Sequence, residues 1–251
     1  MGVDSGLPDF RGPEGFWRAY PAYGRLGLRF EALANPRWFD EDPALAWGFY
    51  GHRLNLYRRT QPHEGFAILG RLAAPMRHGL FAFTSNVDGH FQRAGLSASR
   101  VAEIHGSIDW LQCTRRPCGP AWLAPPEAID VDEETGRARP PLPVCPTCGA
   151  LARPNILMFG DSDWDDARTT AQEARLSDWL VRVGAGRIVV IECGAGTAIP
   201  SVRWFAERLV AERDATLIRV NPREADVPEG AIALPMGARE ALVALASVRG
   251  W

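Results

Sequence analysis

Residues 186–197 read Gly-Arg-Ile-Val-Val-Ile-Glu-Cys-Gly-Ala-Gly-Thr, an apolar run that ends in a glycine-rich turn. The four branched aliphatic residues at 188–191 indicate a strand that is buried on both faces. Residues 201–213 then carry a helical pattern, and a second apolar run follows at 216–220. Buried strands that alternate with helices predict an α/β fold with a doubly wound parallel sheet and helices on both faces.

A third apolar run, Gly-Leu-Phe-Ala-Phe-Thr at 79–84, predicts another strand of the same sheet. It ends in the polar loop Ser-Asn-Val-Asp-Gly at 85–89, and the run at 216–220 ends in Asn221-Pro222. Ligands of such sheets bind at the carboxyl ends of the strands. We therefore expect the polar loops, together with the glycine-rich turn, to form the functional site.

Two stretches interrupt the α/β pattern and predict a small second lobe. Residues 13–75 are rich in aromatic side chains, with helices expected at 43–59 and 64–73, and residues 110–154 carry most of the cysteines and many prolines. The large lobe is then expected to comprise approximately residues 1–12, 76–109 and 155–251. A cleft between two lobes is a common place for a ligand.

The composition is that of an ordinary globular chain: 251 residues, 46% hydrophobic and 23% charged, with a formal net charge of −2. This charge disfavours a nucleic-acid binder that acts through a basic field. All 28 basic residues are arginine, so the chain has no lysine to form a Schiff base. No apolar run is long enough to span a bilayer, and the N-terminus lacks the pattern of a signal peptide. We expect a cytoplasmic protein without membrane contact.

Four of the five cysteines form two close pairs, Cys113 with Cys118 and Cys145 with Cys148. In a chain without secretion signals, two such pairs indicate a zinc site rather than disulfides. Four thiolates suit tetrahedral zinc in a closed structural site. The alternative is four reduced thiols in a metal-free loop. Cys193 is expected to be a packing residue.

Three further motifs carry polar groups suited to chemistry. Asn86 and Asp88 follow a predicted strand two residues apart, and an amide with a carboxylate can hold a carboxamide and a sugar hydroxyl; the alternative is a local Asx turn. His105, in Glu-Ile-His-Gly-Ser, has the side chain most often used as a general base near neutral pH, although a structural histidine is the alternative. The segment 4–12 could contact phosphate through its arginine and free N–H groups, or be a surface turn.

The order of these motifs resembles that of the sirtuins, the NAD-dependent protein deacylases. SGLPDFRG (5–12), TSNVDGHFQRAG (84–95), EIHGS (103–107), the cysteine pairs, RPNILMFG (153–160) and VNP (220–222) follow one another here. The family patterns are SGIPDFRG, TQNIDGLHERAG, ELHGS, two cysteine pairs, RPxVVxFGE and INP. The resemblance covers nearly the whole chain and implies a Rossmann-like NAD-binding lobe with a zinc-bearing small lobe.

The resemblance also implies a role for individual residues. His105 corresponds to the general base and Asn86 to a catalytic and ribose-binding residue. The other implied cofactor-binding residues are Asp9, Phe10, Arg11, Ser85, Asp88, Gly194, Ala195 and Asn221. The implied substrate-binding residues are Ile156, Met158, Phe159 and Gly160, which pair with an acylated peptide by β-addition. In this chemistry the acyl oxygen attacks the nicotinamide ribose, and the products are lysine, nicotinamide and 2′-O-acyl-ADP-ribose.

Tyr50-Gly51-His52-Arg53 resembles the Tyr-x-x-Arg motif of sirtuins that remove succinyl and malonyl groups. An arginine beside a phenol can pair with a terminal carboxylate. The resemblance therefore implies that Tyr50 and Arg53 bind an acidic acyl chain. The alternative is a solvated Arg53 on a helix, with Tyr50 packing the lobe.

The sequence departs from the sirtuin pattern most at its start, where the first strand and its Gly-Ala-Gly turn do not precede SGLPDFRG. Met1 is then expected to be an internal methionine of a longer protein, or the chain is poorly stable and weakly active. Smaller departures are Ser85 in place of glutamine, Asp161 in place of glutamate, and Glu192-Cys193 in the adenine site.

Two alternative functions stay open. One is ADP-ribosyl transfer to protein or NAD hydrolysis in the same pocket, and the other is an inactive, zinc-stabilised peptide-binding module. Oligomeric state is not predicted.

Overall fold

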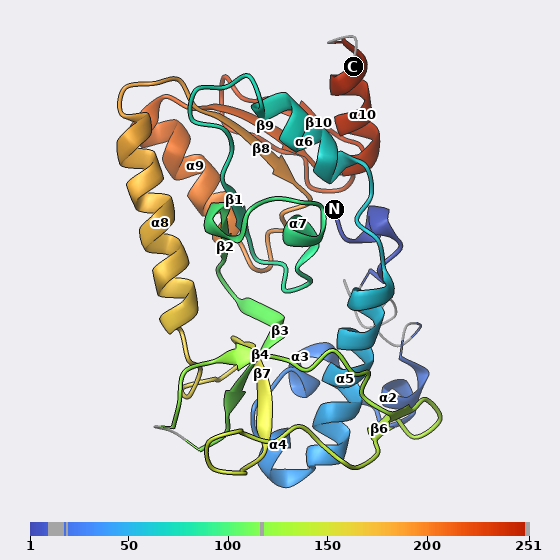
Figure 1. The fold of residues 1–251 in the computed structure, drawn as a ribbon. Helices are drawn as coiled ribbons and strands as arrows, with labels where there is room; N and C mark the ends of the chain where they lie inside the picture. The colour runs from blue at the N-terminus through green and yellow to red at the C-terminus, as the bar shows by residue number, and fades with distance from the viewer. Residues whose placement is uncertain (10–17, 19, 116–117, 249–251) are drawn as a thin grey trace.

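The computed structural model describes residues 1–9, 18, 20–115 and 118–248 (Figure 1). The parallel strands with α6, α8, α9 and α10 occupy the upper end of the molecule in this view, and α2 to α5 with the antiparallel strands occupy the lower end. The helical elements are η1 (Val3–Ser5), α2 (Pro21–Arg25), α3 (Phe30–Leu33), α4 (Trp38–Glu41), α5 (Pro43–Arg59), α6 (Gly65–Ala73), α7 (His90–Arg93), η2 (Ala98–Arg100), α8 (Ala167–Val183), α9 (Ser201–Arg213) and α10 (Ala238–Val248). The strands are β1 (Ala82–Thr84), β2 (Val101–Glu103), β3 (Gly106–Cys113), β4 (Trp122–Leu123), β5 (Val131–Asp132), β6 (Arg137–Ala138), β7 (Ala152–Ile156), β8 (Val189–Cys193), β9 (Thr216–Val220) and β10 (Ile232–Leu234).

The predicted parallel strands are present, and they are divided between two sheets. β8, β9 and β10 form one parallel sheet in the order β10-β9-β8, with Ile191 opposite Ile218. β1 and β2 form a second parallel pair. In the part of the chain that the structure describes, β1 pairs only with β2, and β8 only with β9. A stacked ring pair links β1 to α9, because the ring centroids of Phe83 and Phe205 are 4.0 Å apart, and α9 in turn contacts β8 and β9.

The lower end is built on α5, whose bounds agree with the sequence prediction. Asp42 caps the helix by accepting a hydrogen bond from the backbone N–H of Leu45 at 3.1 Å, and Pro43 occupies the first turn. Trp47 is fully buried and donates from its indole nitrogen to the carbonyl of Ala152 in β7 at 2.9 Å. This bond ties α5 to the antiparallel sheet of β4, β3 and β7.

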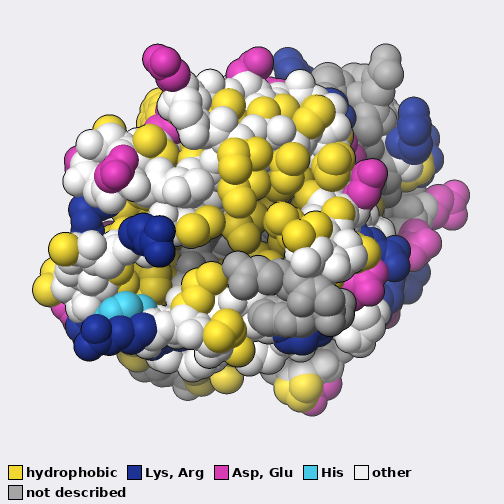
Figure 2. Space-filling view, turned by 90° about the horizontal axis from the view of Figure 1, so that it is seen from above, with side chains coloured by type: hydrophobic (Ala, Val, Ile, Leu, Met, Phe, Trp, Pro, Cys, Tyr) yellow, Lys and Arg dark blue, Asp and Glu magenta, His cyan; other side chains and the backbone are white. Residues whose placement is uncertain are grey.

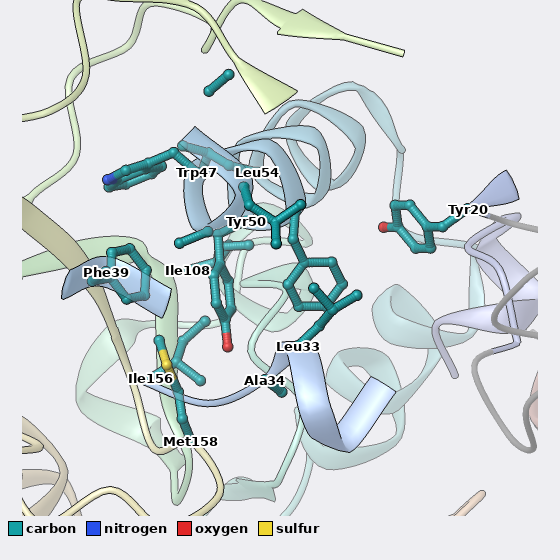
Figure 3. Packing of buried hydrophobic residues seen from close by; sticks show 14 of the residues in the cluster. Tyr20, Leu33, Ala34, Phe39, Trp47, Tyr50, Leu54, Ile108, Ile156 and Met158 are labelled. Carbon is teal, nitrogen blue, oxygen red and sulfur yellow. The ribbon is translucent and has the colours of Figure 1, made fainter. Parts of the chain in front are cut away.

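The largest apolar cluster lies between α5 and this antiparallel sheet (Figure 3). Tyr50 lies in its middle, stacked on Phe39 with a centroid distance of 5.8 Å, and it points toward Met158. Smaller clusters lie around the parallel strands, where residues of α8 and α9 pack together and residues of β8 and β9 contact α10. The core is therefore divided between the two ends of the molecule.

Helix α6 differs from the expected lobe assignment. The sequence places 64–73 with the small lobe, but α6 packs against α10 at the upper end. Ile68 and Leu242, both buried, form the centre of this contact. Since its apolar face finds its partner there, α6 belongs with the parallel strands.

Figure 2 views the molecule from the upper end, where apolar side chains gather over the middle of the face. This end carries β10 and α10, whose exposed apolar residues include Ile232, Val243 and Val248. Within the described ranges, no helix combines the length and the apolar character needed to cross a membrane.

Candidate active site and metal centre

Predicted site residues follow the carboxyl ends of four parallel strands. β1 leads to Asn86 and Asp88, β2 to His105, β8 to Gly194, and β9 to Asn221. Met1 and Gly2 lie between the two sheets at this level. A Cβ on Gly2 would lie 3.6 Å from Oδ2 of Asp88, and one on Gly194 would lie 3.7 Å from the amino group of Met1. The strand-end loops of both sheets therefore lie close together, as predicted for a ligand site.

His105 occupies a tight turn between β2 and β3 that is bonded to the loop after β1. The backbone N–H groups of Ile104 and Ile108 donate to the carbonyls of Thr84 and Val87, each at 3.0 Å. These bonds bracket Asn86, whose side chain is exposed, and hold it beside the histidine turn. Hydrogen bonding along β1 and β2 thus brings together two residues that are far apart in the sequence.

The His105 ring is half-buried, and burial lowers the pKa of the imidazole below its ordinary value of 6.5. A hydrogen bond to the backbone of Ser85 acts in the opposite direction. Because this bond favours the protonated form, the ring is its donor and the carbonyl of Ser85 its acceptor. The other ring nitrogen of neutral His105 is then a proton acceptor, as a general base requires.

Asp88 is buried and makes an Asx turn, which the sequence offered as the alternative to a ligand-binding role. Its Oδ1 accepts from the backbone N–H of His90 at 3.0 Å. Asn86 makes a comparable local bond only through its backbone N–H, which donates to Oγ1 of Thr84 at 3.1 Å. The turn fixes one carboxylate oxygen of Asp88 and leaves the amide of Asn86 at the surface.

The glycine-rich turn after β8 is held by Asn221, which is completely buried. The Asn221 amide nitrogen donates to the carbonyl of Ala195 at 2.9 Å, and its oxygen accepts from the backbone N–H groups of Arg223 and Glu224. Asn221 therefore shapes the turn that contains Gly194, whose φ is +70°. Sequence reasoning found the residue, but its hydrogen bonds here are to the protein backbone.

Asp9 is the last described residue before a gap, and Phe10 and Arg11 lie outside the described residues. The carboxylate of Asp9 accepts from Arg223 at 2.6 Å. This ion pair joins the N-terminal segment to the loop after β9, although 213 residues separate them along the chain. Asp9, the first residue of the expected cofactor-binding segment, is therefore held at the loop that follows β9.

The four predicted zinc ligands form one cluster, with all their sulfur atoms within 4.8 Å of one another. Cys113 and Cys148, like Cys118 and Cys145, have Sγ atoms 3.6 Å apart. Zn–S bonds of about 2.3 Å in a tetrahedron place sulfur atoms about 3.8 Å apart, so this cluster fits zinc. All four cysteines are free thiols, a state that both the zinc site and the alternative of a metal-free loop require.

The local environment favours thiolate formation unevenly across the cluster. Burial raises the pKa of Cys113 to about 12. Burial also opposes ionisation of Cys145, but hydrogen bonds from the backbone of Cys148 and Thr147 lower its pKa to about 6. These N–H groups belong to the Cys-Pro-Thr-Cys turn, so the turn prepares one thiolate for a metal ion.

The predicted substrate segment continues directly from β7. Ile156 and Met158 are buried in the core, whereas Leu157 and Phe159 are 39% and 40% exposed. The backbone N–H of Phe159 donates to the carbonyl of Ala34 at 2.9 Å, and Gly160 closes the segment with a φ of +68°. The exposed side chains alternate with buried ones, as in a half-buried strand.

A buried ion pair beneath this segment was not predicted. Arg153 and Asp161 have side chains 3% and 0% exposed, and both guanidinium terminal nitrogens donate to the carboxylate. Asp161 also accepts from the backbone N–H of Met158 at 3.3 Å, and Arg153 donates to the carbonyl of Ile156 at 3.1 Å. The Arg-Pro motif and the acid after Phe-Gly were visible in the sequence, but nothing there paired them.

A second unpredicted network anchors the strand before the histidine turn. Glu103 is buried, and its carboxylate accepts from Arg168 and from Gln172 of α8. Gln172 also accepts from the backbone N–H of Glu103 at 3.0 Å. The hydroxyl of Thr169 donates to the carbonyl of Glu103 at 3.0 Å, so four bonds to α8 hold Glu103, two residues before His105.

Tyr50 and Arg53 are both buried, so the alternative of a solvated arginine is wrong. Nε and Nη2 of Arg53 donate to the hydroxyl of Tyr57 at 3.0 and 2.8 Å. The guanidinium lies over the rings of Phe30, Phe49, Tyr50 and Tyr57. Tyr50 packs in the core of the lobe, as the alternative interpretation of this motif expected. The phenol and the guanidinium thus lie together behind the substrate segment.

Parallel strands that end in polar loops, a histidine beside an amide, and a four-cysteine cluster define an α/β enzyme with a structural metal site. A family model described as the Sir2 family matches residues 1–191. An "NAD-dependent protein deacylase" of Methylococcus capsulatus is 33% identical over 232 residues, covering 89% of this chain and 78% of the relative. The chain belongs to the Sir2 family.

Two solved structures are similar over nearly the whole chain. A Sir2 homologue in complex with NAD is 28% identical, with a TM-score of 0.66, and covers 99% of this chain and 85% of its own. A mutant Sir2 homologue in complex with 2′-O-acetyl ADP ribose is also 28% identical, with a TM-score of 0.65, over 99% and 88% of the two chains.

Proposed function

We propose that this protein removes acyl groups from lysine side chains of proteins and uses NAD as the acyl acceptor. The observation that carries the proposal is the bonded turn that places His105 beside Asn86 at the carboxyl ends of β1 and β2. Support also comes from family membership and from the names of relatives, which are NAD-dependent protein deacylases. The Rossmann-like lobe, with α6 included, is proposed to bind NAD, and the lobe built on α5 to contact the substrate.

The polar groups at the strand ends fit NAD. Asn86 and Asp88 offer an amide and a carboxylate to the nicotinamide end, and Ser85 lies beside them. Gly194 and Ala195 form the turn proposed to face the adenine ribose, and Asn221 holds that turn. Asp9, Phe10 and Arg11 are proposed to cover the cofactor. When bound, NAD supplies a ribose hydroxyl that takes the acyl group and a nicotinamide that leaves.

His105 is proposed to accept a proton from that ribose hydroxyl. Burial keeps the imidazole neutral at neutral pH, and the bond to Ser85 directs one ring nitrogen away from the substrate. The proton-accepting nitrogen is then fixed in orientation, which lowers the entropic cost of the transfer. Asn86 is proposed to orient the ribose on the opposite side of the turn.

The peptide is proposed to add as a strand along 156–160, where Ile156, Met158, Phe159 and Gly160 form the expected segment. Leu157 and Phe159 offer exposed apolar side chains for contact with the peptide. The acylated lysine then enters beside Tyr50, which points toward Met158 in the core (Figure 3).

We further propose that the acyl site accepts dicarboxylic chains such as succinyl. Arg53 is a buried cation held in place by the Tyr57 hydroxyl and four aromatic rings. Phe30 contacts both the guanidinium of Arg53 and the ring of Phe159, so the charge lies one ring away from the peptide segment. A buried guanidinium binds a carboxylate strongly because little water competes with it.

The cysteine cluster is proposed to hold zinc as a structural ion, distant from the reacting atoms. Cys113 is the last residue of β3. The other three ligands lie in the loop that leads from β3 to β7. The metal would fix this loop against the sheet that carries the substrate segment. Reduced cysteines suit a cytoplasmic location, which we propose for the protein.

The test is nicotinamide release from NAD with matched acetyl-lysine and succinyl-lysine peptides. Peptide-dependent release with loss of the acyl mass from the peptide is expected, and His105→Ala should abolish it without a change in melting temperature. Release without a peptide, or ADP-ribose attached to a protein, would instead identify a hydrolase or a transferase. Peptide binding without any release would identify an inactive binding module.

A further inference from the structure

His90 is a buried titratable group two residues after Asp88, which is part of the proposed nicotinamide site. It is the first residue of α7 and stands where the sirtuin pattern TQNIDGLHERAG has leucine. The ring is 0% exposed, and among the described residues neither Nδ1 nor Nε2 has a hydrogen-bond partner. Buried polar atoms are nearly always hydrogen-bonded, so this imidazole is an exception that calls for a physical explanation.

The geometry connects His90 to Asp88 in two ways. The backbone N–H of His90 donates to Oδ1 of Asp88 at 3.0 Å, which fixes the carboxylate in place. Nδ1 of the ring lies 3.9 Å from Oδ2 of the same carboxylate. This separation is too long for a hydrogen bond, but it suits an ion pair when the ring is protonated. Asp88 is itself nearly buried, so the interaction is weakly screened.

The surroundings of the ring disfavour its protonated form. Phe66 lies edge-on at a centroid distance of 5.6 Å. The charged or titratable groups that face the ring are Asp88, Arg93 on α7, the amino group of Met1, and His63 before α6. Burial, followed by the two cations, lowers the pKa of His90, and only Asp88 acts in the opposite direction. His90 is therefore neutral at neutral pH and gains a proton on acidification.

We propose that His90 makes NAD binding sensitive to acid by setting the charge beside Asp88. The proposal rests on the proposed function, which places the nicotinamide end of NAD at Asp88. With His90 neutral, no cation on His90 competes with the cationic nicotinamide ring for the carboxylate of Asp88. With His90 protonated, the carboxylate is paired and a second positive charge faces that ring, so NAD binds more weakly. Leucine at this position cannot provide such a response.

The experiment measures NAD affinity by calorimetry, without a peptide, at about pH 8 and about pH 5.5. Wild-type protein is compared with His90→Leu, and ADP-ribose, which lacks the cationic ring, serves as a second ligand. We expect wild-type affinity for NAD to fall by about threefold to tenfold more than that of the variant on acidification. Affinity for ADP-ribose should respond equally in both proteins. His105 titrates in both and therefore cancels in the comparison.

Two further variants make the result decisive. His90→Gln removes the titration but keeps a polar side chain, and it replaces His90→Leu if the latter does not fold. His63→Gln keeps an acceptor for the backbone N–H of Gly65 and should retain the wild-type pH response. Equal pH responses of NAD affinity in wild type and both His90 variants would overturn the proposal. Failure of every protein to bind either ligand would overturn the proposed function instead.

Discussion

The backbone N–H of Leu157 donates a hydrogen bond to the carbonyl oxygen of His105 at 3.0 Å. The proposed base and the proposed peptide-binding segment are therefore parts of one hydrogen-bonded unit. The pairing of β3 with β7 continues this contact, with Gly106 opposite Ile156. The position of the peptide segment is therefore tied to that of the histidine turn by this bond and by the adjoining strand pairing.

Substitution of Gly106 by alanine should displace the His105 turn. Gly106 has a φ of +78°, and a Cβ there would lie 2.0 Å from the carbonyl oxygen of Asn155. We expect a loss of roughly 2 kcal/mol or more in the free energy of unfolding and at least a tenfold fall in kcat. Gly95→Ala is the matched control, because Gly95 has a φ of +93° but no atom within 4 Å of the added Cβ. Equal losses in the two variants would show that backbone strain alone is responsible.

On acidification, kcat should begin to fall only below pH 6.5, the ordinary pKa of histidine. Burial lowers the pKa of His105, and the bond to Ser85 only partly opposes this effect. Protonation removes the base, so activity falls as pH decreases through the lowered value and persists at pH 6.5. The measurement is kcat against pH with NAD and peptide at saturating concentrations. Saturation removes the effect of His90 on NAD binding from the profile. An acidic limb above 6.5 would contradict the environment described for the ring.

Replacement of Arg53 by methionine should impair desuccinylation far more than deacetylation. The substitution removes the buried cation but fills a similar volume among the aromatic rings of Phe30 and Phe49. We expect the ratio of kcat/KM for succinyl- over acetyl-lysine peptide to fall by about tenfold or more. Tyr57→Phe, which removes the hydroxyl that accepts from Arg53, should shift the ratio in the same direction by less. Equal losses with both peptides would show that Arg53 acts through packing alone.

Sequence patterns located most of the helices and strands that carry the proposed site, and their limits have physical causes. The helices at 43–59 and 201–213 and the strand at 216–220 agree with the structure, because caps and apolar periodicity are local signals. The cysteine cluster was predicted for a similar reason, since ligand spacing is local. The ion pair of Arg153 with Asp161 and the bonds of Glu103 to α8 depend on how the chain folds back on itself. Local spacing carries no sign of either, and α6 was assigned to the wrong lobe because its partner, α10, lies about 170 residues further along the chain.

Breaking the buried ion pair under the substrate segment should weaken peptide binding as well as stability. Asp161→Asn leaves Arg153 buried without its carboxylate, which costs about 3–5 kcal/mol in such sites. The bond from the backbone N–H of Met158 to Asp161 is weakened at the same time, so KM for the peptide should rise several-fold while KM for NAD changes little. Asp166→Asn, at an exposed aspartate that makes no capping bond at the start of α8, is the control.

The double variant Arg153→Met with Asp161→Leu separates stability from positioning. Because it removes both charges, it should recover much of the lost stability, as replacement of buried pairs by apolar residues often does. It does not restore the bond to Met158, so KM for the peptide should remain raised. Recovery of KM together with stability would show that the pair has no positioning role.

Removal of the metal should unfold the loop that joins β3 to β7 and lower the melting temperature of the whole chain. Cys113 is buried at the end of β3, opposite Ala152 at the start of β7, so the cluster closes the sheet that carries the substrate segment. Zinc bound at such a site contributes directly to folding free energy. We expect one zinc per chain by elemental analysis, and loss of both zinc and cooperative melting in Cys145→Ser or after chelation.

Cys193→Ala is the matched control, because Cys193 lies outside the cluster and packs near Met1. It should retain full zinc content. A stable, active Cys145→Ser protein without zinc would show that the four thiols stabilise the loop without a metal.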